Sequence, residues 1–191
     1  MIDAEIEFLN VYNTFIRRDG AGDMLEWLKN SDFFDAPASS KFHGAYEGGL
    51  CEHSVNVYHR LRKLVDDYYP SLNKPSDETV AIVSLLHDLC KVNYYSVEMR
   101  KRKDEYGRWE EYPTYTIEDT LCMGHGEGSL YRVQRFLTLS LEEAAAINWH
   151  MGYGDVRFRG GDNTVSKAFA KYPLALLLHT ADSMATSFDE I

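Results

Sequence analysis

The stretch ETVAIVSLLHDLCK, residues 78–91, decides the expected fold of this chain. It is apolar on almost every side, a pattern that is typical of a helix buried at the centre of a helical domain. Ser76 stands before the stretch as a helix N-cap, and the acidic residues that follow suit the positive end of a helix dipole. His87 follows Val83 at helical spacing, so we expect a central helix that points a histidine inward.

Apolar residues at helical spacing predict further helices on both sides of this stretch. Residues 94–119 break the helical pattern, because they are rich in Tyr, Val, Thr and Trp and contain the turn signal DEYG. The sequence therefore predicts an all-α bundle with a β-hairpin-like insertion around residues 94–119. The further helices are expected at residues 4–17, 24–29, 50–68, 128–139, 140–150 and 172–188.

The chain has 191 residues, with 20 Lys and Arg against 30 Asp and Glu, and its formal net charge is −10. This length predicts a single domain with a substantial core. The negative charge disfavours duplex nucleic acid as a partner, because non-specific binding to duplexes depends on lysine and arginine. No membrane partner is expected, since no apolar run approaches the roughly 18 residues of a membrane span.

The cysteines indicate the redox state of the protein. Cys51, Cys90 and Cys122 are odd in number and form no C-x-x-C motif. This pattern predicts neither a disulfide framework nor a cysteine-based zinc site. We therefore expect reduced thiols and a cytoplasmic location, and the sequence leaves the oligomeric state open.

Several histidines and aspartates stand where the helix pattern expects apolar residues, or lie beside glycines. Asp182 lies inside an apolar helix and needs a partner, because a buried, unpaired carboxylate is costly. Imidazole together with carboxylate is a ligand set that suits Fe, Mn, Zn, Co or Ni. On a helix, consecutive side chains such as His87 and Asp88 diverge by about 100°, which favours an Asp88 that reaches between two ions. The candidate metal ligands are His53, His87, Asp88, His125, His150 and Asp182.

The order H…HD…H…H…D resembles the HD-domain superfamily of metal-dependent phosphohydrolases. The local forms that carry the resemblance are GGLCEHS (48–54), LLHDLCK (85–91), GHG (124–126) and HTAD (179–182). The resemblance covers about residues 41–187. It implies an all-α HD-domain bundle in which residues 1–191 form one catalytic domain, with N-terminal helices in 1–40 and a metal-binding core in about 41–188.

The same resemblance implies two divalent transition-metal ions, with Fe or Mn favoured and Zn, Ni, Co or Mg as alternatives. Asp88 would bridge the two ions. Two cations about 3.5–4 Å apart can lower the pKa of a shared water enough to give hydroxide near neutral pH. The expected activity is therefore that of a phosphoric ester hydrolase. By resemblance, the first ion would be held by His53, His87, Asp88 and Asp182, and the second by Asp88, His125 and His150.

The predicted substrate is a small phosphorylated compound, most simply a nucleotide. Asp88 and Lys91 are the predicted catalytic residues, and Lys91, His43, Arg157 and Arg159 are expected to contact the substrate. Residues 41–53, KFHGAYEGGLCEH, also resemble a segment of an HD-domain 3′→5′ exoribonuclease family. Members of that family carry an additional N-terminal nucleic-acid-binding domain, which we do not expect in this sequence, so RNA is not the predicted substrate.

Two other functions fit the same residues. Some HD-domain proteins with these six ligands are mixed-valent di-iron oxygenases that cleave C–C or C–P bonds, and the ligands alone do not separate them from hydrolases. A nucleotide-sensing module without turnover is the third interpretation. The basic run at residues 100–103, RKRK, is read either as a solvated face or as a flap that guides an anionic substrate.

Overall fold

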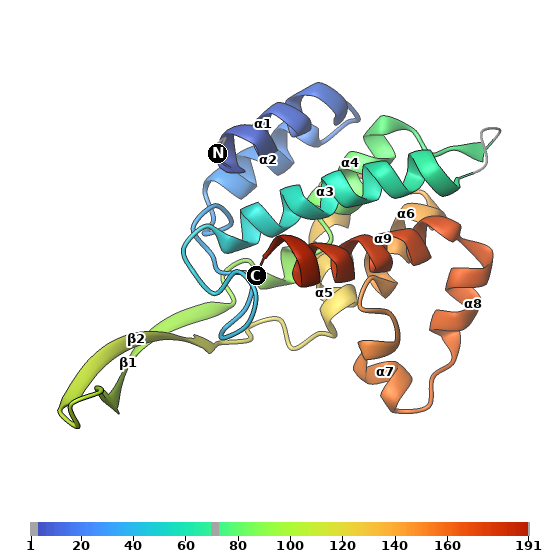
Figure 1. Cartoon of the computed structure of the whole chain (residues 1–191). Coiled ribbons are helices and arrows are strands. Elements are labelled where there is room, and N and C mark those ends of the chain that lie inside the picture. Colours follow the sequence, from blue (N-terminus) through green and yellow to red (C-terminus); the bar gives the residue numbers. More distant parts are fainter. Residues whose placement is uncertain (1–3, 70–72, 191) are drawn as a thin grey trace.

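The computed structural model describes residues 4–69 and 73–190, and it is a helical bundle with one projecting hairpin (Figure 1). Short 3-10 turns occupy Leu89–Lys91 and Gly152–Gly154, and a π-helical turn occupies Ala185–Asp189. This architecture confirms the predicted all-α bundle with a hairpin insertion. The helices are α1 (Ala4–Phe15), α2 (Ala21–Lys29), α3 (Gly49–Tyr68), α4 (Asp77–Leu85), α5 (His125–Gln134), α6 (Leu141–Trp149), α7 (Val156–Arg159), α8 (Thr164–Lys171) and α9 (Pro173–Met184), and the strands are β1 (Tyr95–Lys103) and β2 (Trp109–Ile117).

Helix α3 organises the core of the bundle. It packs against α4 and α9, while α1 lies against α3 and α4, and α6 packs on α9 (Figure 1). Burial of large apolar side chains at these contacts is the main favourable term in folding. Fully buried examples from three of these helices are Leu61, Ile82 and Leu178.

Two helix starts form as the sequence predicts. The Ser76 hydroxyl accepts a hydrogen bond from the Thr79 amide at 3.1 Å, which caps α4. At α6, Ser140 and Glu143 form a capping box, in which each side chain bonds to the backbone N–H of the other residue. These caps satisfy amide groups that a helix leaves unpaired at its N-terminus.

The central helix ends earlier than the sequence predicts. Helix α4 stops at Leu85, and His87 and Asp88 lie in the turn that leads into the 3-10 turn. The His87 Nδ1 donates to the carbonyl oxygen of Ser84 at 2.7 Å, so the side chain satisfies a carbonyl at the helix end. The expectation that His87 and Asp88 diverge by a helical step was therefore wrong, and a turn sets their directions instead.

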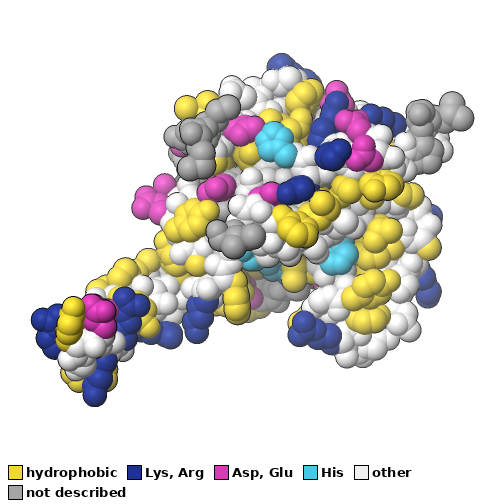
Figure 2. Space-filling model, in the orientation of Figure 1, with side chains coloured by type: hydrophobic (Ala, Val, Ile, Leu, Met, Phe, Trp, Pro, Cys, Tyr) yellow, Lys and Arg dark blue, Asp and Glu magenta, His cyan; other side chains and the backbone are white. Residues whose placement is uncertain are grey.

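The hairpin forms a long two-stranded arm. Its antiparallel register runs from the Tyr95–Ile117 pair to the Lys103–Trp109 pair, and Gly107 adopts a φ of 76° in the turn. Lys and Arg side chains gather toward its far end (Figure 2). Several of these cations pair with carboxylates, as Lys101 does with Glu111 at 3.3 Å. This pairing favours the interpretation of the basic run as a solvated face.

Two further sequence expectations concern thiols and membranes. Within residues 4–69 and 73–190, Cys51, Cys90 and Cys122 form no disulfide bond. Over residues 4–69 and 73–190, every helix is too short or too polar to cross a bilayer.

A buried ion pair fastens the N-terminal helices to α6. Arg18 donates to both carboxylate oxygens of Glu143, at 2.9 and 2.8 Å, and Thr79 donates to Glu143 at 2.8 Å. Burial alone would raise the pKa of Glu143, but the bonds from Arg18, the Ser140 amide and Thr79 hold it below its usual value. Such a group adds stability above the pKa it has in the unfolded chain, and this stability is lost as the pH falls through the folded value.

We expect Glu143→Gln to lower the free energy of unfolding at pH 7 by about 2 kcal/mol, because Arg18 loses the closer of its two carboxylate partners, Glu143 and Glu78. The difference from the unsubstituted protein should shrink below about pH 4, where the carboxylate takes up a proton. Urea unfolding at pH 7 and pH 3.5 measures both effects, and exposed Glu47→Gln is the matched control. An equal loss of stability at both pH values would contradict this account.

Candidate metal centre

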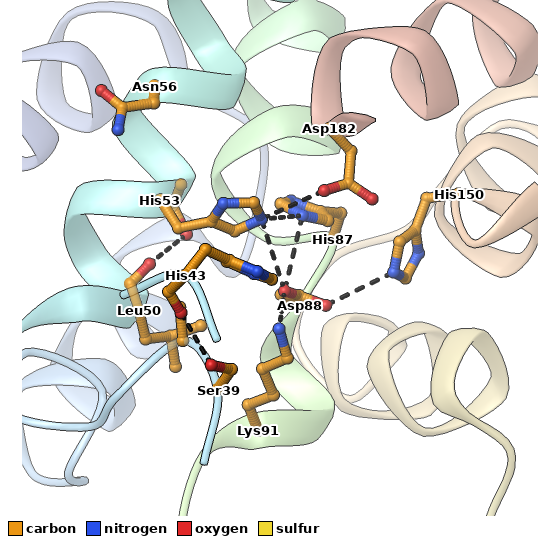
Figure 3. A network of polar contacts seen from close by, with 12 residues as sticks. Ser39, His43, Leu50, His53, Asn56, His87, Asp88, Lys91, His150 and Asp182 are labelled. Carbon is orange, nitrogen blue, oxygen red and sulfur yellow. Dashed lines mark hydrogen bonds and ion pairs between the residues drawn. The ribbon is translucent and has the colours of Figure 1, made fainter. Parts of the chain in front are cut away.

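Six side chains from five parts of the chain meet in one place. Five of these side chains point toward one another in Figure 3. They are His53 from α3, His87 and Asp88 from the turn after α4, His150 at the end of α6, and Asp182 from α9. His125, the first residue of α5, completes the group. His53, His87, Asp88 and His150 are at most 3% exposed. The structure thus brings together all six residues that the sequence marks as candidate ligands.

Asp88 lies at the centre of this group. Its Oδ1 is 2.7 Å from His125 Nε2 and 3.3 Å from His150 Nε2. Its Oδ2 is 3.6 Å from His53 Nε2 and 3.7 Å from His87 Nε2 (Figure 3). One carboxylate therefore faces four imidazole nitrogens, two on each oxygen.

Two of these imidazoles turn a lone pair toward the carboxylate. His87 Nδ1 donates to the carbonyl of Ser84, and His150 Nδ1 donates to the carbonyl of Ile147, both at 2.7 Å. The Nε2 atoms of neutral rings fixed in this way are acceptors. His150 Nε2 is buried and has no hydrogen-bond partner. His87 Nε2 lies 3.2 Å from His53 Nε2, so of these two nitrogens it is His150 Nε2 that lacks a partner among the described residues, and a cation between it and Asp88 would satisfy it.

The donor set fits a metal ion. Ligand atoms of His53, His87 and Asp182 lie within 4.8 Å of one another, and so do those of His87, Asp88 and His150. Imidazole nitrogens and carboxylate oxygens suit divalent transition metals. The backbone carbonyls that hold His87 and His150 are the outer contacts that usually orient such ligands. The residues present therefore satisfy both the inner and the outer requirements of a metal centre.

Burial and charge shape the protonation of the centre. Burial outweighs the attraction of Asp88 and lowers the pKa of His87 to about 4, so this ring stays neutral. Burial also acts on Asp88, but Lys91 and the surrounding histidines hold its pKa well below the usual range. His87 and Asp88 thus offer the neutral imidazole and the ionised carboxylate that metal ions bind. Burial opposes charge on His53 and His125, but Asp182 and Glu190 raise the pKa of His53 to about 9, and Cys90 and Asp88 raise that of His125 to about 10, so a bound cation would displace a proton from each ring.

Two residues that sequence analysis missed support the predicted ligands. Glu190 Oε1 is 2.9 Å from His53 Nδ1, and Asn56 donates to the same oxygen at 3.2 Å. Cys90 Sγ is 3.4 Å from His125 Nδ1. Glu190 lies beyond the predicted core of residues 41–188, and no local motif marks it. The position of Cys90 two residues after Asp88 is the only signal that could have drawn attention to its thiol.

A cavity of about 330 Å³ opens beside the centre. His43, Asp88, Lys91 and Asp182 line it, so the two predicted substrate contacts His43 and Lys91 lie at the site (Figure 3). Lys91 Nζ is 2.6 Å from Asp88 Oδ2. Burial opposes the charge on Lys91, but Asp88 raises its pKa above the usual value, so the ammonium stays protonated.

The two predicted arginines lie elsewhere. Arg157 bonds to Asp155 at 2.7 Å and to Glu127 at 2.6 Å, and its guanidinium lies 3.8 Å from the centre of the Trp149 ring. These contacts hold Arg157 within the fold. Neither Arg157 nor Arg159 is among the described residues that line the cavity beside Asp88. Their roles in substrate binding stay predictions, without a contact in their favour.

The chain is similar to part of several curated enzymes. It is 37% identical over 94 residues to the 3′-5′ exoribonuclease YhaM of Listeria welshimeri, and 36% identical over 95 residues to that of Bacillus velezensis. These alignments cover 49% and 50% of this chain and 25% of each relative. No family model and no solved structure matches the chain.

This similarity bears on the predicted class of enzyme. Relatives named exoribonucleases support the resemblance to the HD-domain family and a hydrolase of phosphoric esters as the activity class. The comparisons do not test the type of metal site. They give no support to the oxygenase interpretation.

The similarity also corrects the predicted substrate. The sequence analysis expects a small phosphorylated compound and excludes duplex nucleic acid as a partner. The relatives are named as exoribonucleases, which act on RNA. The small-substrate prediction conflicts with these names and was wrong. That prediction set RNA aside because an N-terminal nucleic-acid-binding domain was not expected, and it set duplexes aside because of the net charge, although the local charge of a site decides what binds there.

We expect Glu190→Ala to weaken metal binding roughly 10- to 100-fold, because His53 loses the carboxylate that orients its ring. Glu190→Gln keeps an acceptor for His53 Nδ1 and should recover part of the affinity. Competition with a chromophoric chelator measures the affinity for Mn²⁺ directly. Glu47→Gln, on the exposed surface, is the control. Unchanged affinity in Glu190→Ala would show that Glu190 does not support the centre.

Proposed function

We propose that this chain is a metal-dependent phosphohydrolase that removes nucleotides from the 3′ end of RNA. One observation carries the proposal. The buried His150 Nε2, which has no hydrogen-bond partner among the described residues, faces the Asp88 carboxylate beside His87, and a cation there would satisfy these groups at the edge of a cavity that also holds Lys91. The relatives named exoribonucleases support RNA as the substrate class.

We further propose that the centre holds two ions, as the family resemblance implies, with Asp88 between them. Iron or manganese suits the mixture of nitrogen and oxygen donors. Bound ions would supply an activated water and positive charge for the phosphoryl oxygens. One ion would be held by His53, His87, Asp88 and Asp182, and the other by Asp88, His125 and His150.

Lys91 and His43 would bind the phosphate. The Lys91 ammonium is 8% exposed and lines the cavity, where it can hold a phosphoryl oxygen as a point charge. The His43 ring lies 5.2 Å from the His53 ring and also lines the cavity. Burial lowers the pKa of His43, so at neutral pH the ring is uncharged and can donate one hydrogen bond. Both residues thus offer donors to an anionic group beside the centre.

We expect the metal-loaded chain to shorten a 5′-labelled single-stranded RNA stepwise from its 3′ end. Asp88→Asn should lower the rate at least about 1,000-fold, because the amide loses the charge that would bind the ions. A denaturing gel that resolves single nucleotides follows the ladder of products with time.

The control for this experiment is Lys29→Met, an exposed substitution on α2 that should leave the rate unchanged. Circular dichroism establishes that the Asp88→Asn protein is folded. Internal cleavage by the native chain, or no cleavage with Mn²⁺, Fe²⁺ or Zn²⁺, would overturn the proposed function.

A further inference from the structure

A second cavity, of about 250 Å³, adjoins the cavity beside the metal centre. His125 and Met151 line both cavities, so the two are neighbours across these side chains. The residues that line the second cavity come from the start of α5, from the segment that leads from β2 to α5, from residues 151–156 after α6, and from Cys90 and Tyr94. No predicted substrate contact accounts for it.

The two cavities differ in chemistry. The cavity beside the centre is lined by ionisable groups, among them Asp88 and Lys91. The second cavity is lined mainly by apolar side chains. Its aromatic and aliphatic lining comes from Tyr94, Leu121, Met123, Met151 and Val156. A pocket of this composition suits a flat, weakly polar group, since apolar and aromatic walls provide most of the contact area in ligand sites.

The charged groups of the second cavity are carboxylates that already have partners. Asp155 accepts from the Arg157 side chain at 2.9 and 2.7 Å. Asp119 accepts from the backbone amides of Leu121 and Cys122, both at 3.0 Å. The Arg157 guanidinium balances the charge of Asp155, while the Asp119 carboxylate disfavours a phosphate at this end and Lys91 attracts one at the other end. A ligand with one anionic end and one flat end would therefore lie in a single orientation.

Glycine keeps the floor of the second cavity open. A Cβ added at Gly128 would lie 3.2 Å from Cys90 Cβ and 3.5 Å from Leu121 Cδ1. Those two neighbours also line the cavity. Gly128 therefore leaves space where a larger residue would crowd the lining.

We propose that this cavity binds the nucleobase of the nucleotide that is removed, while the phosphate lies at the metal centre. This assignment rests on the proposed function, since a nucleotide is the part of RNA that has both kinds of end. Tyr94 offers a ring for stacking, and both oxygens of Asp155 are already bonded to Arg157. Recognition is therefore by stacking and packing, which tolerate every base.

The test compares two ligands that differ only by the base: adenosine 5′-monophosphate and ribose 5-phosphate. Calorimetric titration of the full chain with Mn²⁺ gives both dissociation constants. We expect the nucleotide to bind roughly 5- to 150-fold more tightly, the range that one stacked base contributes. Tyr94→Ala should reduce this ratio to about 2 or less, and Tyr94→Phe should preserve it, because stacking needs the ring and not the hydroxyl.

Tyr131→Ala is the matched control, because Tyr131 is 47% exposed on α5 and does not line the cavity. Equal affinity for the two ligands, binding of neither, or a ratio that Tyr94→Ala leaves unchanged would overturn the assignment. The outcome is independent of RNA cleavage. A chain that cleaves RNA without a base effect keeps its proposed function and loses this subsite. A chain that shows the base effect but cleaves no RNA keeps this subsite and loses its proposed function.

Discussion

The site depends on one electrostatic constraint, which is the placement of a buried carboxylate among imidazole lone pairs. Asp88 is 3% exposed, and His87 and His150 face it with the nitrogens that do not donate to the backbone. In the structure, Lys91 supplies a compensating positive charge at 2.6 Å from one oxygen of Asp88. The other oxygen faces His150 Nε2, which has no hydrogen-bond partner. A divalent cation would satisfy all of these groups together and would let the bundle keep them buried.

The fold serves this constraint by bringing distant segments to one point. Helix α3 contacts both α4 and α9, so His53 and Asp182 meet the turn that carries Asp88. The metal centre also depends on the early end of α4. The turn after this helix directs His87 and Asp88 into the same centre, whereas a longer helix would direct them to different faces. Glu190 then supports His53 from the π-helical end of the chain. The two cavities meet at His125, so the geometry offers one place for charge and an adjacent place for an apolar group.

Most of the helices and the six clustered residues could be predicted from the sequence, because both depend on local patterns. The stripe around His53 gave α3, and the capping box of Ser140 gave the start of α6. Helix α8 and the turn at Asp88 could not be predicted in this way. In the turn, a side-chain bond from His87 to a helix carbonyl outweighs the apolar pattern that favours a longer helix. Glu190 was missed because its contact with His53 spans 137 residues, and no spacing rule covers such a distance.

Elemental analysis of the purified chain shows directly whether the buried Asp88 and its histidines hold metal ions. The protein would be loaded with Mn²⁺ or Fe²⁺, freed of loose ions by gel filtration and measured by mass spectrometry of the metals beside its Asp88→Asn variant. We expect two ions per native chain and fewer than one ion per chain in the variant. A folded native chain that retains no metal, or that retains as much as the variant does, would contradict this expectation.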